Sequence, residues 1–292
     1  MRPASALASL HVAVALFGVA GLFGAWLAMS PAAIVLGRTL VAALALGALA
    51  LATRMPARPV PGLPLNGAVL ALHWVAFFAA IQASSVSVGL LGFSSFPLWT
   101  LLLERLAGER RGSPRDWAIA ALGVAGLVLT VPRFDSEDAS LRGLAWGVLS
   151  AMTFAWLAVR NRRFARSHPA RSIALWQNAF AALCLVPVVL LWPGAAAWPG
   201  AREVALIVVL GVVCTALAHT LFVASLATVS AHTASVVAAL EPVYGIALAA
   251  WLLGERPTVG MLAGCALLVA AGVEASRGER GVGGKGVGIR IG

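Results

Sequence analysis

Apolar residues dominate the chain in long runs, separated by short segments that hold most of its charged residues. Most runs are near the length of about 17 to 25 residues that a helix needs to cross a bilayer. The pattern predicts an all-α integral membrane protein with ten transmembrane helices, roughly Leu7 to Leu27, Ala32 to Ala52, Leu65 to Ile81, Val86 to Leu106, Trp117 to Val131, Leu141 to Val159, Ile173 to Trp192, Val204 to Leu226, Ala231 to Leu253 and Pro257 to Val273.

Composition supports this interpretation and excludes an ordinary soluble domain. Of the 292 residues, 61% are hydrophobic and 11% are charged, whereas a soluble domain has about 25% charged residues. The net charge of +10 does not indicate a nucleic-acid-binding protein, because the arginines lie in short clusters between apolar runs. The expected surroundings are therefore a lipid bilayer, with no nucleic-acid partner.

The arginine clusters also predict the orientation of the chain. Positive residues concentrate in the cytoplasmic loops of membrane proteins. With a cytoplasmic N-terminus, most of the 21 basic residues fall inside, in the segments near 2, 54–58, 105–115, 160–171 and 277–290. Both termini are therefore expected in the cytoplasm, as in a protein of a bacterial-type inner membrane.

Two stretches share one plan and indicate an internal duplication. Phe93 to Arg110 and Ala238 to Arg256 each carry a proline early in an apolar helix, and each ends in Gly-Glu-Arg. The connection from Val131 to Leu141 divides the spans five and five, which predicts repeats over 1–133 and 134–273. An odd number of spans per repeat inverts the second copy, an arrangement common in secondary transporters.

A glycine-rich basic segment follows the last predicted span. Residues 274–292 have no apolar periodicity, which predicts a flexible cytoplasmic tail. The tail's GVGGKG lacks the spacing and the Ser/Thr of a phosphate-binding P-loop. ATP hydrolysis, and with it a nucleotide cofactor, is therefore not expected.

The two Pro-containing stretches carry a family resemblance. LEPVYGIALAAWLLGER (240–256) and FPLWTLLLERLAGER (96–110), together with Pro31 and Gly37-Arg38, resemble the EamA branch of the drug/metabolite transporter (DMT) superfamily. The resemblance covers about 13–273 and implies a ten-helix inner-membrane carrier without cofactors, in many bacterial members an exporter of amino acids or related metabolites. The branch that exports aromatic amino acids is one neighbour. The second half departs from the pattern, with Gln177 and Asn178 where a matching arginine would stand.

Two charged residues within predicted spans are the leading candidates for substrate binding, because charge is costly in a membrane. Glu241 lies roughly 18 Å from the outer end of its helix, where it would bind a substrate ammonium, carry a proton, or serve as a structural carboxylate. Arg38 would bind a substrate carboxylate, or form a structural ion pair, or cap carbonyls freed by a helix break. Pairing of Arg38 with Glu241 is a further hypothesis.

Other polar and aromatic residues at membrane depth form a second rank of candidates. They would line a pocket or, equally, fill the core. Pro97 and Pro242 are expected to be bending points, since proline removes one intrahelical hydrogen bond. The remaining substrate-pocket candidates are His73, Trp74, Phe78, Trp99, Trp156, Trp176, Gln177, Asn178, His219 and Tyr244.

Other classes of protein find less support. The three cysteines fall within predicted spans without metal-ligand spacing, so no metal site is expected. An intramembrane enzyme would need a nucleophile with its base, and the chain has no GxSxG and no HExxH. A structural or receptor-like membrane protein is the alternative that the sequence leaves open. The prediction is a secondary transporter of a small polar metabolite, most simply an amino acid exporter, that works by alternating access.

Overall fold

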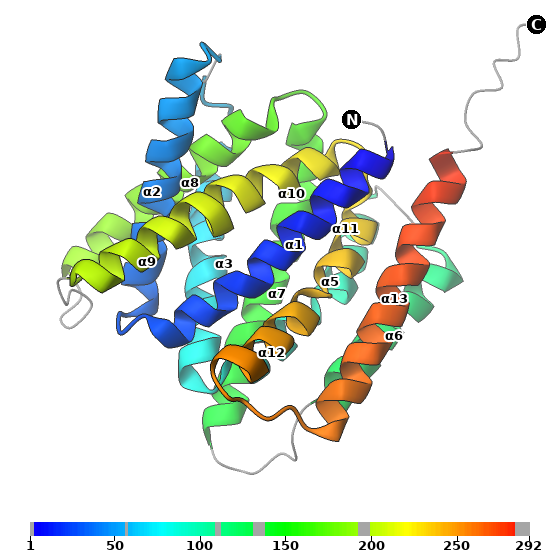
Figure 1. The fold of residues 1–292 in the computed structure, drawn as a ribbon. Helices are drawn as coiled ribbons and strands as arrows, with labels where there is room; N and C mark the ends of the chain where they lie inside the picture. The colour runs from blue at the N-terminus through cyan, green and yellow to red at the C-terminus, as the bar shows by residue number, and fades with distance from the viewer. Residues whose placement is uncertain (1–2, 56–57, 109–111, 131–137, 192–198, 284–292) are drawn as a thin grey trace, which may run out of the picture.

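The computed structural model describes residues 3–55, 58–108, 112–130, 138–191 and 199–283 (Figure 1). Throughout these residues the regular structure is helical, without a strand. The elements are α1 Pro3–Trp26, α2 Pro31–Ala52, α3 Leu63–Ala83, α4 Val86–Phe93, α5 Phe96–Leu106, α6 Pro114–Thr130, α7 Asp138–Ala165, α8 Ala170–Leu191, α9 Ala201–Gly211, the π-helix η1 Val212–Leu217, α10 Ala218–Leu226, α11 Ala231–Ala238, α12 Glu241–Leu252 and α13 Val259–Gly283.

Eight helical units are long and apolar enough to cross a membrane. Three of them are built from consecutive elements: α4 with α5, α9 through η1 to α10, and α11 with α12. The all-α membrane fold is thus confirmed. α6 has 17 residues and the apolar part of α13 covers only Val259–Ala271, so the count of ten spans stays a prediction.

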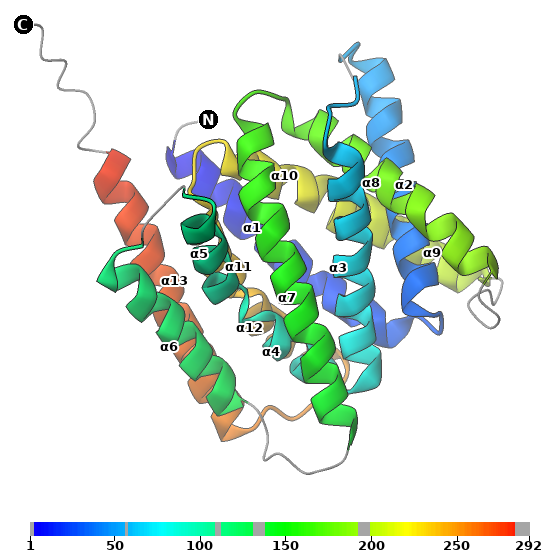
Figure 2. The same cartoon turned by 180° about the vertical axis from the view of Figure 1, so that it is seen from behind.

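The helices form a bundle around one aromatic core. α3 packs against α7 and α8, and α1 packs against α10 and α12 (Figures 1 and 2). The main cluster of buried hydrophobic side chains lies between these two groups, with members from α1, α3, α4, α7 and α10. α6 and α13 pair with each other at one edge and reach the bundle through α5 and α11. This core is where the membrane-depth candidates converge.

The two Pro-containing spans break in the same way. α4 and α11 each have eight residues and begin after a serine whose hydroxyl accepts a backbone N–H: Ser85 from Val88 at 3.2 Å, and Ser230 from Thr233 at 3.1 Å. Two residues then link each of them to α5 or α12, in which proline occupies the second position. Proline is tolerated there because the first turn of a helix has no intrahelical partner for its N–H.

The ends of these broken spans also correspond. Gly108 follows α5 and Gly254 follows α12, each with φ of 70°, a left-handed conformation that favours glycine. The second helix has 11 residues in one copy and 12 in the other, which accounts for the one-residue difference between the two sequences. The predicted boundary between the repeats, at 133/134, lies outside the described residues, and the end of the predicted connection Val131 to Leu141 is helical because α7 begins at Asp138.

Serine hydroxyls satisfy carbonyls at the first break. Ser94 Oγ donates to the Leu90 carbonyl at 3.0 Å and Ser95 Oγ to the Gly92 carbonyl at 2.9 Å. Water is absent from the core of a bilayer, so an interrupted helix needs such internal partners. These serine hydroxyls therefore supply hydrogen bonds to backbone carbonyls at the break.

α4 and α7 approach each other through glycines, which gives a testable prediction. A Cβ on Gly92 would lie 2.8 Å from the Leu144 carbonyl oxygen and 2.9 Å from Gly147 Cα, both backbone atoms that cannot rotate away. Gly92→Ala is expected to destabilise the protein by about 1 to 3 kcal/mol through overpacking. Thermal unfolding in detergent measures this. Gly47→Ala is the control, since its nearest neighbour is a side-chain atom at 3.9 Å; equal melting temperatures would refute the prediction.

The last helix runs past the last predicted span. α13 continues to Gly283, into the segment 274–292 for which a flexible cytoplasmic tail is predicted. At the start of this extension Glu274 pairs with Arg115 of α6 at 2.6 Å. Residues 284–292 lie outside the described residues.

Candidate transport site

Arg38 of α2 is held in the core of the bundle with 1% of its surface exposed. Its Nε donates to Thr215 Oγ1 at 2.8 Å, and its Nη2 donates to the Cys214 carbonyl at 3.2 Å. The guanidinium lies 4.1 Å from the ring centre of Trp74 and 5.4 Å from that of Phe78. Two hydrogen bonds and two aromatic faces therefore fix its position, and its Nη1 amine makes no hydrogen bond to a residue that the structure describes.

The partners of Arg38 come from the π-helix η1. A π-helical turn bonds residue i to i+5 and so disturbs the regular ladder of carbonyls; here Thr215 Oγ1 donates to the Leu210 carbonyl at 2.7 Å. The Cys214 carbonyl is the group that Arg38 caps. The carbonyl-capping role considered for Arg38 is thus present in the structure, and it leaves room for a second role toward a ligand.

Glu241 is the first residue of α12 and is 3% exposed. A carboxylate at a helix N-terminus is stabilised by the backbone N–H groups and dipole there. No hydrogen bond or ion pair joins its carboxylate to another described residue, and Arg38 lies beyond the 4.0 Å of an ion pair. The two side chains thus form no ion pair within 4.0 Å in this conformation, and their direct pairing stays a hypothesis.

Two histidines complete the polar groups. His73 Nδ1 of α3 is 2.9 Å from the Ser150 carbonyl, and its ring stacks on Phe154 with centres 4.8 Å apart. Ser150 Oγ also lies 2.9 Å from this nitrogen. The carbonyl only accepts and the hydroxyl can accept as well, so a proton on Nδ1 satisfies both contacts and leaves the Nε2 of the neutral ring as an acceptor. This assignment follows from the hydrogen-bond network.

His219 of α10 has the opposite tautomer by the same reasoning. The Asn178 amide nitrogen donates to the Ala174 carbonyl at 2.8 Å and lies 3.3 Å from His219 Nδ1. The nitrogen that faces an N–H donor must accept, so the proton of this ring is on Nε2. One histidine therefore offers an acceptor and the other a donor.

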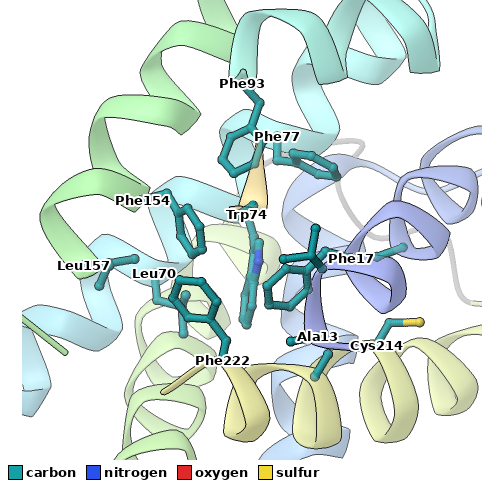
Figure 3. Close-up of a cluster of buried hydrophobic side chains, with 14 of the residues drawn as sticks. Ala13, Phe17, Leu70, Trp74, Phe77, Phe93, Phe154, Leu157, Cys214 and Phe222 are labelled. Carbon is teal, nitrogen blue, oxygen red and sulfur yellow. The ribbon is translucent and has the colours of Figure 1, made fainter. Parts of the chain in front are cut away.

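These four polar side chains line one small cavity. Its volume is about 20 Å³, room for about one water molecule. The rest of its wall is apolar and mostly aromatic, and Figure 3 shows several of these rings directed toward one another from α1, α3, α4 and α7. The lining consists of Arg38, His73, His219 and Glu241 with Phe17, Ala20, Leu70, Trp74, Phe77, Phe93 and Phe154.

Seven of the predicted site residues meet at this cavity. Arg38, His73, Trp74, His219 and Glu241 form part of its wall. Phe78 lies against the Arg38 guanidinium, and Asn178 orients His219. These residues come from α2, α3, α8, α10 and α12, far apart in sequence.

The other five candidates lie elsewhere. Gln177 bonds with Asn161 in a buried network that includes Asn66. Trp99 donates to Ser95 Oγ at 3.3 Å, Trp176 contacts Phe180 in a tilted arrangement with ring centres 5.8 Å apart, and Tyr244 packs against Gly18 of α1. Trp156 lines a second cavity, between α5 and α7.

The sequence interpretation missed most of the aromatic wall. Phe17, Phe77, Phe93 and Phe154 lie in apolar runs and look like any lipid-facing phenylalanine. Thr215 was not predicted as a site residue either, because no pattern in the sequence predicts the π-helical turn that places it. In the described part of the chain no group of three or more His, Cys, Asp or Glu residues could hold a metal ion, and the three cysteines are free.

Comparison with known proteins agrees with this architecture. Residues 141–273 match the EamA-like transporter family. A solved crystal structure superposes with a TM-score of 0.76 over 97% of this chain and 99% of its own; at 22% identity this likeness shows the fold alone.

Named relatives point the same way. An uncharacterized transporter of Archaeoglobus fulgidus is 26% identical over 66% of this chain and 68% of its own length. The pseudopaline exporter CntI of Pseudomonas aeruginosa is 28% identical over 76% of this chain and 77% of its own. The chain is thus similar to EamA-like transporters, and this match together with the relatives named as transporters supports a multi-pass membrane transporter of a small molecule.

Proposed function

We propose that this transporter exports an amino acid or a related small zwitterion. The observation that carries the proposal is that Arg38 and Glu241 line one cavity without pairing with each other. A substrate carboxylate would take the unused N–H groups of Arg38, whose planar fork suits a carboxylate. The substrate ammonium would take Glu241. Opposite charges fixed in one place select a molecule that carries both.

The aromatic wall supports the substrate's remaining part. Phe17, Phe93 and Phe154, which are labelled in Figure 3, give the cavity that Arg38 and Glu241 line an apolar surface. Ligand pockets combine such walls with a few placed polar groups. This favours an amino acid with an apolar or aromatic side chain. Outward transport is proposed from the relative named as an exporter.

A cavity of about 20 Å³ cannot hold an amino acid, so the wall must move for a substrate to enter. Three contacts between the predicted repeats hold it closed. Ser87 Oγ donates to Glu255 Oε2 at 2.6 Å at one end. At the other end Arg162 lies 3.9 Å from Glu104, and His232 lies 3.6 Å from Asp116. Alternating access would open one end at a time.

The inverted-repeat arrangement is part of this proposal. It is supported by the matching breaks of the two Pro-containing spans and by the family match, which begins at 141 and ends at 273, close to the predicted second repeat. Both termini are placed in the cytoplasm. Reporter fusions at each terminus, active only on one side of the membrane, test that orientation.

The prolines at the breaks give a kinetic prediction. Pro97→Ala with Pro242→Ala supplies an N–H that can bond a carbonyl of the preceding helix across each break and so stiffen both spans, and turnover at saturating substrate is then expected to fall roughly threefold or more. Flux in proteoliposomes measures this. Pro187→Ala is the matched control, since Pro187 lies inside the unbroken α8 at an exposed position. Wild-type turnover in the double variant would contradict a bending role.

Flux of radiolabelled solutes into proteoliposomes tests the function. Phenylalanine is compared with phenethylamine, which lacks the carboxylate, and with 3-phenylpropionate, which lacks the ammonium. We expect protein-dependent flux of the amino acid and at most weak flux of the two analogues. Equal flux of all three would reject two-charge recognition, and flux no greater than in protein-free liposomes across an amino acid panel would reject the substrate class.

A further inference from the structure

The second cavity lies away from the transport site, between α5 and the C-terminal part of α7. Its volume is about 310 Å³, and the two helices lie beside each other in Figure 2. On one side are Leu103 and Leu106, and on the other Trp156, Val159, Arg160 and Arg163. No acidic side chain of the described residues lines it. Basic groups on an apolar wall suit an anion attached to an apolar body.

The Arg160 side chain is fixed beside the cavity by its contacts. Its Nε donates to Asn66 Oδ1 at 3.0 Å, and its guanidinium lies 4.9 Å from the ring centre of Trp156 and 5.6 Å from that of Phe164. These contacts fix the side chain and use only Nε. The two terminal amines make no hydrogen bond to a described residue, so they remain for a ligand at the cavity.

The place of the cavity indicates the source of the anion. Leu106, the last residue of α5, is 83% exposed, as expected for a side chain that faces hydrocarbon. Arg160 and Arg163 lie in the last six residues of α7, where basic side chains meet lipid headgroups, and Trp156 lies one turn further into the helix. In the predicted orientation this end faces the cytoplasmic leaflet. Basic pockets between helices on that side are a known setting for anionic headgroups.

We infer that the crevice between α5 and α7 binds an anionic phospholipid, with the headgroup phosphate on Arg160 and Arg163 and an acyl chain along Leu103, Leu106 and Val159. The site is separate from the central cavity, so it does not depend on the proposed substrate. It joins a helix of the first predicted repeat to one of the second.

Tryptophan quenching tests the inference on the full-length protein in detergent. Phosphatidylglycerol and phosphatidylcholine with brominated acyl chains are titrated in parallel, and Trp156→Phe identifies the quenching that comes from Trp156. Phosphatidylglycerol is expected to quench Trp156 at lower concentration. The double variant Arg160→Gln with Arg163→Gln should weaken phosphatidylglycerol binding by roughly fivefold for each arginine removed. Arg166→Gln, an exposed arginine of the same chain segment outside the cavity lining, should leave it unchanged.

The outcomes of this titration distinguish a phospholipid headgroup from a soluble anion. Equal quenching by both lipids, or undiminished phosphatidylglycerol quenching in the double variant, would overturn the site. Displacement of the lipid by millimolar inorganic phosphate would assign the arginines to a soluble anion and overturn the lipid assignment. Size-exclusion elution and melting temperature report folding. If the double variant fails these checks, the exposed Arg163→Gln alone decides by the same criterion.

Discussion

Arg38→Gln is expected to weaken amino acid binding by at least about 30-fold, because loss of a buried charged partner costs about 2 to 5 kcal/mol. Glutamine keeps a polar group near Thr215 but loses the charge and the planar fork. The loss should fall on the substrate carboxylate, so the concentration for half-maximal flux rises more than the maximal flux falls. Concentration-dependent flux in proteoliposomes measures both.

Two further variants separate substrate binding from carbonyl capping. Arg38→Lys keeps the charge without the fork and should show an intermediate affinity. Thr215→Val removes the hydrogen bond to Arg38 Nε while keeping the charge, so it should lower the melting temperature more than the affinity. If Arg38→Gln lowers the melting temperature as Thr215→Val does and leaves substrate affinity intact, Arg38 is a structural cap alone.

The sequence predicted the features that membrane chemistry makes conspicuous. A charge within an apolar run is costly, which is why Arg38 and Glu241 stood out and why both line the central cavity. A proline within such a run predicts a helix break, and α5 and α12 begin one residue before Pro97 and Pro242. These signals are local, so one sequence suffices to find them.

The sequence could not tell which way a side chain at membrane depth points. Gln177 and Asn178 are neighbours, yet successive helical residues differ by about 100° around the axis. Asn178 reaches His219 at the central cavity and Gln177 reaches Asn161 on α7. Trp156 had the expected depth but faces α5. The depth of a residue in the membrane follows from its place along the helix. The direction in which its side chain points depends on how the helices pack.

The aromatic wall was hidden for the same reason. Phe154 is surrounded by His73, Phe93 and Phe222 from three other elements, with ring centres 4.8 to 5.4 Å away. Its contacts are all long-range, and its own segment gives no sign of them. The tautomers of the two histidines were likewise fixed by partners on other helices.

Glu241→Gln is expected to reduce amino acid flux by about 30-fold at low substrate, since glutamine fills the same space without the charge that binds the ammonium. The change should spare 3-phenylpropionate, which has no ammonium, so the ratio of the two fluxes is the informative measurement. Glu203→Gln is the matched control, because Glu203 is a carboxylate of α9 paired with the adjacent Arg202. An equal loss for both solutes would show that Glu241 supports the fold instead of the ligand.

The same variant decides whether Glu241 also carries a proton. Among the described residues, Glu104 is the other carboxylate buried within a spanning unit, and Arg162 lies 3.9 Å from it. Glu241 forms no ion pair with a described residue and lines the cavity. If Glu241 exchanges a proton for the substrate, an imposed pH gradient should drive flux in the wild type and have no effect in Glu241→Gln. If the variant keeps the full response to the gradient, the coupling group is elsewhere, and His73, whose Nε2 is an acceptor, becomes the residue to replace next. Loss of the response together with loss of ammonium selectivity would place both roles on one carboxylate, so that the substrate and the proton compete for Glu241.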